Sequence, residues 1–291
     1  MIRSLLFLPG NNPNMLINGN YLGADAVIFD LEDAVSPLEK DAARILVRNT
    51  LKFMQHDKAK TVVRINSVDT DFWKLDLNEI IPQKPDYILL PKASTPTDII
   101  AVDAYISSIE ENLNIKNPTK LIALIETTLG VENAFLIATA CKRVSALFLG
   151  AEDLTADLQC KRTKEGMEID YSRKRLVVAA RAAGVDVFDT PFTDVNDDEG
   201  IFDDARLARS LGFSGKASIS PRHVSAINNV FSPTQSEIDY AKDVLLAIQD
   251  AKAQGKGAIA LNGKMIDAPI VARAERTIES AKALGLIKET E

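Results

Sequence analysis

Acidic side chains close several of the short apolar runs of this sequence. The acids in question are Asp30, Glu32, Asp33, Glu126, Glu152 and Asp153. Carboxylates gathered at one place repel one another and raise each other's pKa unless a cation lies among them. A small set of hard oxygen ligands is typical of Mg²⁺, which keeps waters and takes substrate oxygens as further ligands. If the fold brings these acids together, the sequence predicts a magnesium site.

Each of these acids also has an ordinary structural interpretation. Glu32 and Asp33 lie just before a predicted helix, and acids are common at the start of helices. Asp153 could cap a turn in the same way. At Glu126 the next residue, Thr127, is the more usual cap, which favours a functional role for the glutamate.

Two basic residues follow apolar runs as well. Arg64 lies near the end of the run 61–65, where it is either the partner of an internal acid or a receptor for a substrate carboxylate. Lys92 follows the run 87–90, and a lysine at such a place can form a Schiff base with a carbonyl substrate. Its alternatives are a phosphate-binding or a structural lysine beside acids. The sequence contains no Ser-His-Asp arrangement, P-loop or nucleotide-binding fingerprint.

The elements that would position these residues alternate regularly. Runs that are apolar on both faces are typical of parallel strands covered on both sides. Eight such runs are residues 4–8, 26–29, 61–65, 87–90, 121–125, 146–149, 185–188 and 216–219. Segments with helical spacing lie between them, including residues 39–53, 98–113, 131–140, 171–183 and 200–211.

Eight such units predict an α/β fold, a closed (β/α)8 TIM barrel over residues 1–230. Barrel enzymes carry their function at the C-terminal ends of the strands, which is where the acids lie in the sequence. An open doubly wound sheet is the alternative, but no G-x-G-x-x-G follows the first run. Residues 231–291 form a C-terminal extension of helix 233–254, a hairpin-like stretch 255–265 and helix 268–284. We expect it to cap the barrel mouth or to reach a neighbouring subunit.

The composition argues against several classes of protein. A net charge of -7 and the absence of a long Lys/Arg run argue against a nucleic-acid or anionic-membrane surface. No run reaches the roughly 20 apolar residues of a membrane helix, and the first run is too short for a signal peptide. Cys141 and Cys160 provide no disulfide framework. His56 and His223 are too few histidines for a typical zinc or iron site. We therefore expect a cytoplasmic enzyme.

The motifs around the candidate residues resemble the citrate lyase β-subunit group of the HpcH/HpaI aldolase superfamily, which also contains malyl-CoA and citramalyl-CoA lyases. The resemblance extends from Arg3 nearly to the end of the chain. Its motifs are RSLLFLPG at 3–10, FDLEDAV at 29–35, VRIN at 63–66, LPK at 90–92, IET at 125–127, LGAEDL at 149–154, FSGK at 213–216 and LNGKMIDAP at 261–269. The resemblance implies a magnesium-dependent carbon–carbon lyase that cleaves a 3-hydroxyacyl thioester into an acyl thioester and a 2-oxo acid.

The same resemblance implies roles for individual residues. Glu126 and Asp153 would bind Mg²⁺, with Glu126 also at the substrate, and Glu32 and Asp33 would hold water around the ion. Arg64 would bind the substrate carboxylate or the developing enolate oxygen. In chemical terms, the ion would lower the pKa of the substrate hydroxyl and polarise the carbonyl that forms as the bond breaks.

Further residues would act on the carrier and across subunits. Arg3, with Ser4 nearby, would contact the phosphates of coenzyme A or of a phosphopantetheine arm. Members of the group are typically trimers, so we expect a homotrimer or hexamer. In such an assembly Asp267 would be delivered by the extension into a neighbour's site as the acid/base group.

One departure concerns the carrier. Many stand-alone coenzyme A lyases of this group have a histidine before the proline that follows the eighth strand, whereas Ser220 precedes Pro221 here. This favours the citrate lyase β-subunit type, whose substrate rides on acyl carrier protein and whose partners include other citrate lyase subunits. The carrier stays open, as do three alternatives: a thioester hydrolase with the same metal site, a non-catalytic subunit of a larger complex, and a Schiff-base aldolase acting through Lys92.

Overall fold

The computed structural model describes residues 1–253, 259–261 and 264–287. The chain divides into two compact units, Ile2–Asn228 and Asn229–Glu291, with Met1 grouped with the second. Each unit is described by itself.

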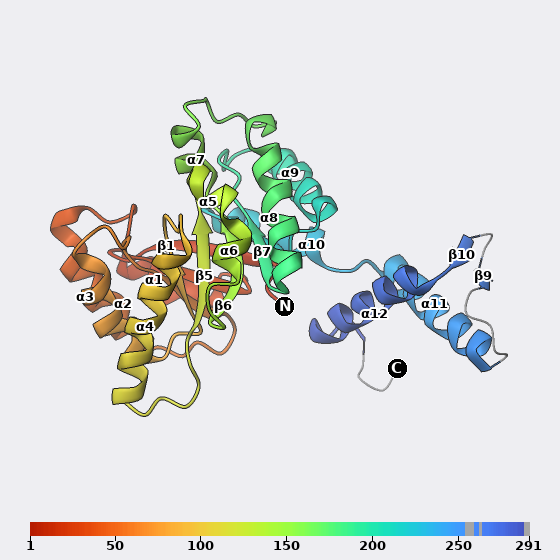
Figure 1. Ribbon diagram of the computed structural model, residues 1–291, viewed down its shortest axis with the longest axis horizontal. Helices are drawn as coiled ribbons and strands as arrows, with labels where there is room; N and C mark the ends of the chain where they lie inside the picture. The colour runs from red at the N-terminus through yellow and green to blue at the C-terminus, as the bar shows by residue number, and fades with distance from the viewer. Residues whose placement is uncertain (254–258, 262–263, 288–291) are drawn as a thin grey trace. The chain divides into compact units, whose positions relative to one another are not determined.

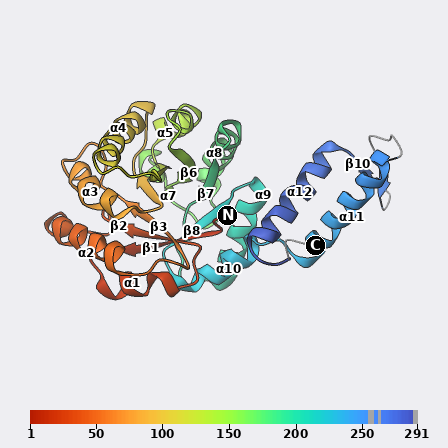
Figure 2. The ribbon, with the colours of Figure 1, turned by 90° about the horizontal axis from the view of Figure 1, so that it is seen from below.

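The first unit is a closed barrel of eight parallel strands that follow one another in sequence order. Figure 2 shows these strands at the centre with helices around them. The strands are β1 (Ser4–Pro9), β2 (Ala26–Asp30), β3 (Lys60–Arg64), β4 (Tyr87–Leu90), β5 (Lys120–Ile125), β6 (Val144–Leu149), β7 (Asp186–Asp189) and β8 (Gly215–Ser218). The predicted (β/α)8 barrel is confirmed, and β1 pairs with both β2 and β8, so the sheet has no open edge.

The barrel interior is filled by alternate residues of the strands, because successive side chains of a strand point to opposite faces. The interior cluster contains Leu5, Ala26, Ile28, Val62, Leu89, Ile122, Leu124, Ala146, Phe148, Phe188 and Ala217. The next inward-facing position of each strand lies two residues after its last interior side chain, and this position is at the barrel mouth. The positions reached in this way include Asp30, Arg64, Glu126, Gly150 and Thr190.

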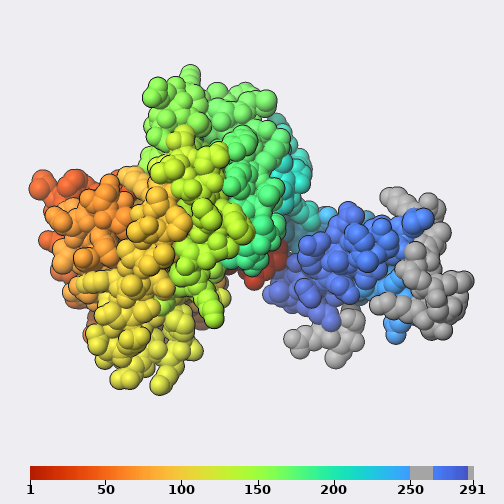
Figure 3. Space-filling view, viewed as in Figure 1, coloured from red at the N-terminus to blue at the C-terminus, as the bar shows by residue number. Residues whose placement is uncertain are grey.

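Helices cover the outside of the barrel, and Figure 1 shows them around the strands. They are α1 (Pro13–Asn18), α2 (Lys40–Phe53), α3 (Phe72–Ile80), α4 (Pro96–Asn112), α5 (Thr128–Glu132), α6 (Ala134–Ala138), α7 (Ala151–Asp157), α8 (Asp170–Ala183), α9 (Asp198–Leu211) and α10 (Pro221–Phe231). Short 3-10 turns lie at Gly19–Tyr21, Pro37–Glu39, Ile81–Gln83 and Met167–Ile169. In Figure 3 the yellow to green surface includes α4, α5, α6, α7 and α8, which lie on one face of this unit.

One predicted helix differs from the structure. Residues 131–140 were predicted as one helix, but α5 and α6 are separate five-residue helices that meet at Asn133. The Asn133 backbone leaves the helical region there, with φ -86° and ψ 4°. Its side-chain amide donates a hydrogen bond of 2.9 Å to the carbonyl of Ser94. This bond to a neighbouring loop holds Asn133 where the two helices meet. The helical spacing of apolar residues does not predict such a break.

The second unit is a pair of helices, α11 (Gln235–Ala253) and α12 (Ala268–Ala283), with the short antiparallel strands β9 (Ile259–Leu261) and β10 (Lys264–Ile266). Its buried cluster consists of Ala241, Val244, Ile266 and Ala274. The predicted hairpin-like stretch 255–265 lies partly outside the described residues. Within the described part of the chain, no helix has the length and apolar character needed to cross a bilayer.

Candidate active site

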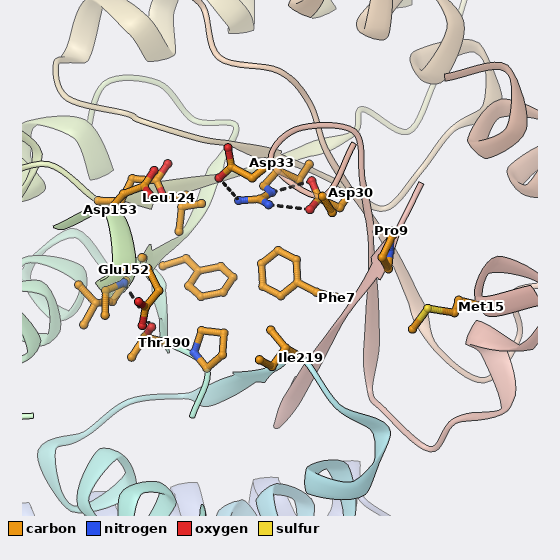
Figure 4. Close-up of a pocket in the computed structure, with 18 residues that line it drawn as sticks. Phe7, Pro9, Met15, Asp30, Asp33, Leu124, Glu152, Asp153, Thr190 and Ile219 are labelled. Atoms are coloured by element: carbon orange, nitrogen blue, oxygen red, sulfur yellow. Dashed lines mark hydrogen bonds and ion pairs between the residues drawn. The ribbon is translucent and has the colours of Figure 1, made fainter. Parts of the chain in front are cut away.

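A pocket of about 370 Å³ opens at the C-terminal ends of the barrel strands. This volume falls within the range of small-molecule sites, roughly 300–1,000 Å³. Among its lining residues are Phe7, Asp30, Asp33, Arg64, Glu126, Gly150, Asp153 and Thr190. In Figure 4 the labelled Asp153 and Glu152 lie on one side of the pocket and Asp30 on the other, with the ring of Phe7 between them.

Arg64 is held at the mouth by carboxylates on two sides. Its Nε and Nη2 donate to the two oxygens of Asp30 at 2.8 and 2.6 Å, a bidentate pair between neighbouring strand ends. Its Nη1 lies 3.0 Å from Glu32 and 3.5 Å from Asp33. The guanidinium also lies 5.1 Å from the ring centroid of Phe7. Burial alone would lower the pKa of Arg64, but Asp30, Glu32 and Glu126 outweigh it and raise the pKa.

Glu126 is the most strongly perturbed acid of the site. Its side chain is buried, and Oε1 accepts a hydrogen bond of 2.7 Å from the backbone N–H of Lys92. Burial, followed by the negative charge of Glu32, raises its pKa to about 8, although Arg64 acts in the opposite direction. Thr127, not Glu126, caps α5, because its hydroxyl accepts from the N–H of Gly130 at 3.0 Å. The glutamate is therefore free to face the pocket.

Gly150 makes room for the Glu126 carboxylate. A Cβ at position 150 would lie 2.6 Å from Oε2 of Glu126 and 2.7 Å from its Cβ, distances that side-chain carbons do not tolerate. The missing side chain therefore leaves a space that the buried carboxylate occupies. Replacing this hydrogen by a methyl group would force Glu126 to move.

Lys92 and Glu32 form an ion pair of 3.1 Å beside this carboxylate, and the Lys92 ammonium is 4.0 Å from Asp153. Neither Glu32 nor Asp33 caps the following helix; both face Arg64 instead. Burial would lower the pKa of Lys92, but Glu32 and the other acids outweigh it and raise the pKa. Because a Schiff-base lysine must lose its proton to become a nucleophile, this environment disfavours the covalent aldolase. The Lys92 backbone is left-handed, with φ 53°, which aims its N–H at Glu126.

The charges of the site fit a divalent cation. We call the carboxylates of Asp30, Glu32, Asp33, Glu126 and Asp153 the acidic mouth. Three cations accompany them: Arg64, Lys92 and Lys40, whose ammonium binds the carbonyls of Leu31 and Glu32. The carboxylates outnumber these cations by two. Burial is the main cause of the raised pKa of Glu126, and the negative charges of Glu32 and Asp153 add to it.

Among the residues that the structure describes, no group of three or more His, Cys, Asp or Glu side chains is arranged to hold a metal ion by itself. Mg²⁺ is ordinarily bound by one or two carboxylates together with waters and substrate oxygens, so the chemistry of a Glu126–Asp153 pair fits this ion. Asp153 is 42% exposed, which leaves it accessible to such a ligand sphere. The buried Glu126 would supply the less accessible ligand.

The structure does not bring Arg3 and Ser4 to this pocket. They lie at the start of β1, whose six residues place the first roughly 15–20 Å from the last. The Arg3 guanidinium is paired with Asp25 through bonds of 2.8 and 2.7 Å. Ser4 is fully buried and donates to Asn228 at 2.7 Å. Within this unit both residues have structural contacts at the N-terminal end of the barrel, opposite the mouth.

Asp267 belongs to the second unit, where it is the N-cap of α12. Its side chain accepts a hydrogen bond of 3.3 Å from the N–H of Ile270. The residue is exposed, so its second carboxylate oxygen is available to solvent or to another molecule. The N-cap contact is a sufficient structural reason for an aspartate here, and an acid/base role stays a prediction.

Two side chains of the site and one pairing were missed from the sequence. Phe7 lies beneath the Arg64 guanidinium, Thr190 lines the pocket from the end of β7, and Asp30, which was named among the acids, is the partner that holds Arg64. All three continue the alternate, inward-facing positions of their strands. Counting in twos from the interior apolar residues would have found them, because the side-chain period of a strand is two.

Comparisons with known proteins agree with this geometry. A model of the family described as HpcH/HpaI aldolase/citrate lyase matches residues 3–221. The chain is 42% identical over 286 residues to the citrate lyase subunit beta of Leuconostoc mesenteroides subsp. cremoris, covering 98% of this chain and 95% of that protein. It is 33% identical over 283 residues to a (3S)-malyl-CoA thioesterase of Cereibacter sphaeroides, covering 97% and 95%.

Among solved structures, the chain is similar to protein CitE of Mycobacterium tuberculosis in complex with magnesium, acetoacetate and coenzyme A. The TM-score is 0.79 at 30% sequence identity, and the match covers 96% of this chain and 97% of that one. The similarity therefore includes the second unit as well as the barrel.

Proposed function

The chain belongs to the HpcH/HpaI aldolase/citrate lyase family and is a lyase, and we propose that it cleaves a 3-hydroxyacyl thioester with the help of Mg²⁺. The substrate is of the citryl, malyl or citramalyl type, on coenzyme A or acyl carrier protein, and the products are an acyl thioester and a 2-oxo acid. The observation that carries this proposal is the acidic mouth, in which the charges of Glu32 and Asp153 act on the buried Glu126. The magnesium in the complex of the M. tuberculosis protein supports the choice of ion.

The residues of the site have roles that follow from the bond to be broken. Glu126 and Asp153 would hold the ion, which would supply Lewis-acid chemistry at the substrate hydroxyl and at the forming carbonyl. Arg64 faces the pocket with its positive charge fixed by Asp30. Because it is held in place beforehand, it stabilises the substrate carboxylate or the enolate oxygen without reorganisation. Phe7 and Leu124 line the pocket with apolar surface.

The proton balance of the cleavage requires one acid/base group. The 3-hydroxyl group loses its proton, its carbon becomes the carbonyl of the 2-oxo acid, and the electrons of the broken carbon–carbon bond pass to the thioester enolate. The enolate carbon then takes up a proton and the acyl thioester leaves. We assign this transfer to Asp267 of a neighbouring subunit in a homotrimer or hexamer, because an exposed carboxylate can both accept and return a proton.

A product screen tests this function. The purified protein is incubated with citryl, malyl and citramalyl thioesters on both carriers, with and without Mg²⁺, and products are identified by mass spectrometry. We expect equal amounts of an acyl thioester and a 2-oxo acid, formed only with Mg²⁺. Glu126→Ala and Asp153→Ala should remove this turnover while circular dichroism shows a folded barrel. Wild-type rates in both variants would refute the assignment.

A thioester hydrolase is the second candidate, and the 33% identity to a malyl-CoA thioesterase favours it. The same screen separates the two activities, because hydrolysis releases the free carrier thiol without a 2-oxo acid. A third outcome, turnover only after other citrate lyase subunits are added, would show that the chain acts as a subunit of a larger complex.

A further inference from the structure

The helix that carries Asp153 begins without a cap of its own. The N-cap position of α7 is Gly150, which has no side chain to accept from the first free N–H groups of the helix. A capping side chain cannot be placed there, because its Cβ would meet the Glu126 carboxylate. The glycine that leaves space for Glu126 therefore gives no side-chain cap to α7, the helix that carries Asp153.

Thr190 supplies the missing acceptor from another strand end. Its hydroxyl oxygen accepts a hydrogen bond of 3.2 Å from the N–H of Ala151, the first residue of α7 (Figure 4). Ala151 lies two residues before Asp153, so this bond fixes the turn from which the Asp153 side chain leaves. Thr190 is almost fully buried, which shields the bond from water.

Lys216 in turn fixes Thr190. Its ammonium donates to the backbone carbonyl of Thr190 at 2.6 Å and to Asp189 at 2.7 Å, and it pairs with Asp204 at 2.5 Å. Lys216 is fully buried. Two hydrogen bonds and one ion pair hold the buried ammonium, so its position is fixed from three sides. The sequence motif FSGK ends on this residue, and the proposed reaction gives it no direct role.

Arg173 provides a natural comparison within the same network. It binds Asp189 through Nε and Nη2 at 3.0 and 2.9 Å and Asp204 at 2.7 Å. Both cations therefore neutralise the same two buried aspartates. Of the two, Lys216 is bonded to the Thr190 carbonyl. A merely structural role predicts similar effects of losing either cation, whereas a positioning role predicts a difference.

We propose that Lys216 and Thr190 are positioning residues of the magnesium site, which act by holding the first turn of α7 so that Asp153 faces Glu126. This inference rests on the proposed function, because it takes those two carboxylates as the ligands of the ion. Removing groups that orient metal ligands typically weakens metal binding by about 10–100-fold.

The test measures Mg²⁺ binding without substrate by isothermal titration calorimetry, together with the Tm of each metal-free variant. Thr190→Val removes the hydroxyl with little change of shape, and we expect its Mg²⁺ Kd to rise about tenfold. Thr190→Ser keeps the hydroxyl and should bind as the wild type does. Lys216→Met and Arg173→Met should both lower the Tm, but Lys216→Met should weaken Mg²⁺ binding by the larger factor. Hydrogen exchange at the Ala151 amide should become faster in Thr190→Val and stay slow in Thr190→Ser.

The outcomes distinguish this inference from the function on which it rests. If the wild type binds no Mg²⁺, the proposed function fails. If the wild type binds Mg²⁺ and Thr190→Val binds it equally well, the positioning role is overturned and the function stands. Equal losses of Mg²⁺ affinity in Lys216→Met and Arg173→Met would likewise show that Lys216 has only a structural role. If Lys216→Met does not fold, the Thr190 pair of variants decides the question alone.

Discussion

At the scale of single residues, Glu126 combines burial with the repulsion of neighbouring acids. Either effect alone would favour its protonated form, and together they raise its pKa to about 8. Between its ordinary value of 4.5 and about 8, the folded metal-free protein holds a proton that the unfolded chain has lost. The stability contributed by this proton is therefore complete below about pH 4.5 and is lost as the pH rises through 8.

Magnesium binding should consequently depend on pH. Because the ion competes with the proton on Glu126, we expect the apparent affinity to rise about tenfold per pH unit from pH 6 to 8 and to level off above. Calorimetry in two buffers of different ionisation enthalpy should detect nearly one proton released per ion at pH 6–7. Glu126→Gln, which has no such proton, should bind weakly and with no pH dependence in this range. An affinity that is flat from pH 6 to 8 in the wild type would contradict this account.

At the scale of the elements, the loop between β6 and α7 has to serve both candidate ligands. Gly150 follows β6, stands beside Glu126 and precedes the turn that carries Asp153. Its φ of -101° is open to any residue, so the glycine is required by space and not by backbone conformation. This distinguishes it from Gly184, whose φ of 72° requires glycine although no atom lies within 4 Å of a Cβ there.

Alanine at these two glycines should therefore have different effects. Gly150→Ala should displace the Glu126 carboxylate and weaken Mg²⁺ binding at least tenfold, with a loss of about 1–3 kcal/mol in stability from overpacking. Gly184→Ala should cost about 1 kcal/mol through backbone strain and leave the Mg²⁺ Kd unchanged. Denaturant unfolding and calorimetry measure the two quantities separately. Equal Mg²⁺ affinities in the two variants would show that Glu126 does not depend on this space.

Most of the barrel was predictable from the sequence, because parallel strands buried on both faces are almost wholly apolar. All eight strands were expected within two residues of their observed ends. The Asp30–Arg64 pair was missed, although both residues close successive strands and share a register position. By contrast, the cap that Thr190 gives to α7 depends on how the ends of β6 and β7 lie in space. The spacing of apolar residues in the sequence does not predict such a contact.

At the scale of the whole molecule, the first strand places two candidate residues away from the pocket. Arg3 and Ser4 open a motif that the resemblance connects with the carrier of the substrate. Since a barrel strand runs from the base to the mouth, its first residues lie at the opposite end from the pocket. The contact of Arg3 and Ser4 with the carrier phosphates stays a prediction.

The proposed transfer of Asp267 between subunits predicts complementation. Asp267→Ala should damage the acid/base group, and Glu126→Gln should damage the barrel site. If each site combines the barrel of one subunit with the extension of its neighbour, co-refolding equal amounts of the two inactive variants should restore about a quarter of wild-type activity. That fraction follows because half of the barrels and half of the extensions are intact and assort at random in a symmetric ring.

The matched control mixes Glu126→Gln with Asp153→Ala, both in the barrel. Every barrel in that mixture carries one damaged ligand, so no combination of neighbours can produce an intact site. Size-exclusion chromatography with light scattering would confirm that both mixtures assemble alike. Activity in the first mixture and none in the second would place Asp267 in a neighbour's site. No activity in either mixture, with assembly intact, would mean that each subunit completes its own site.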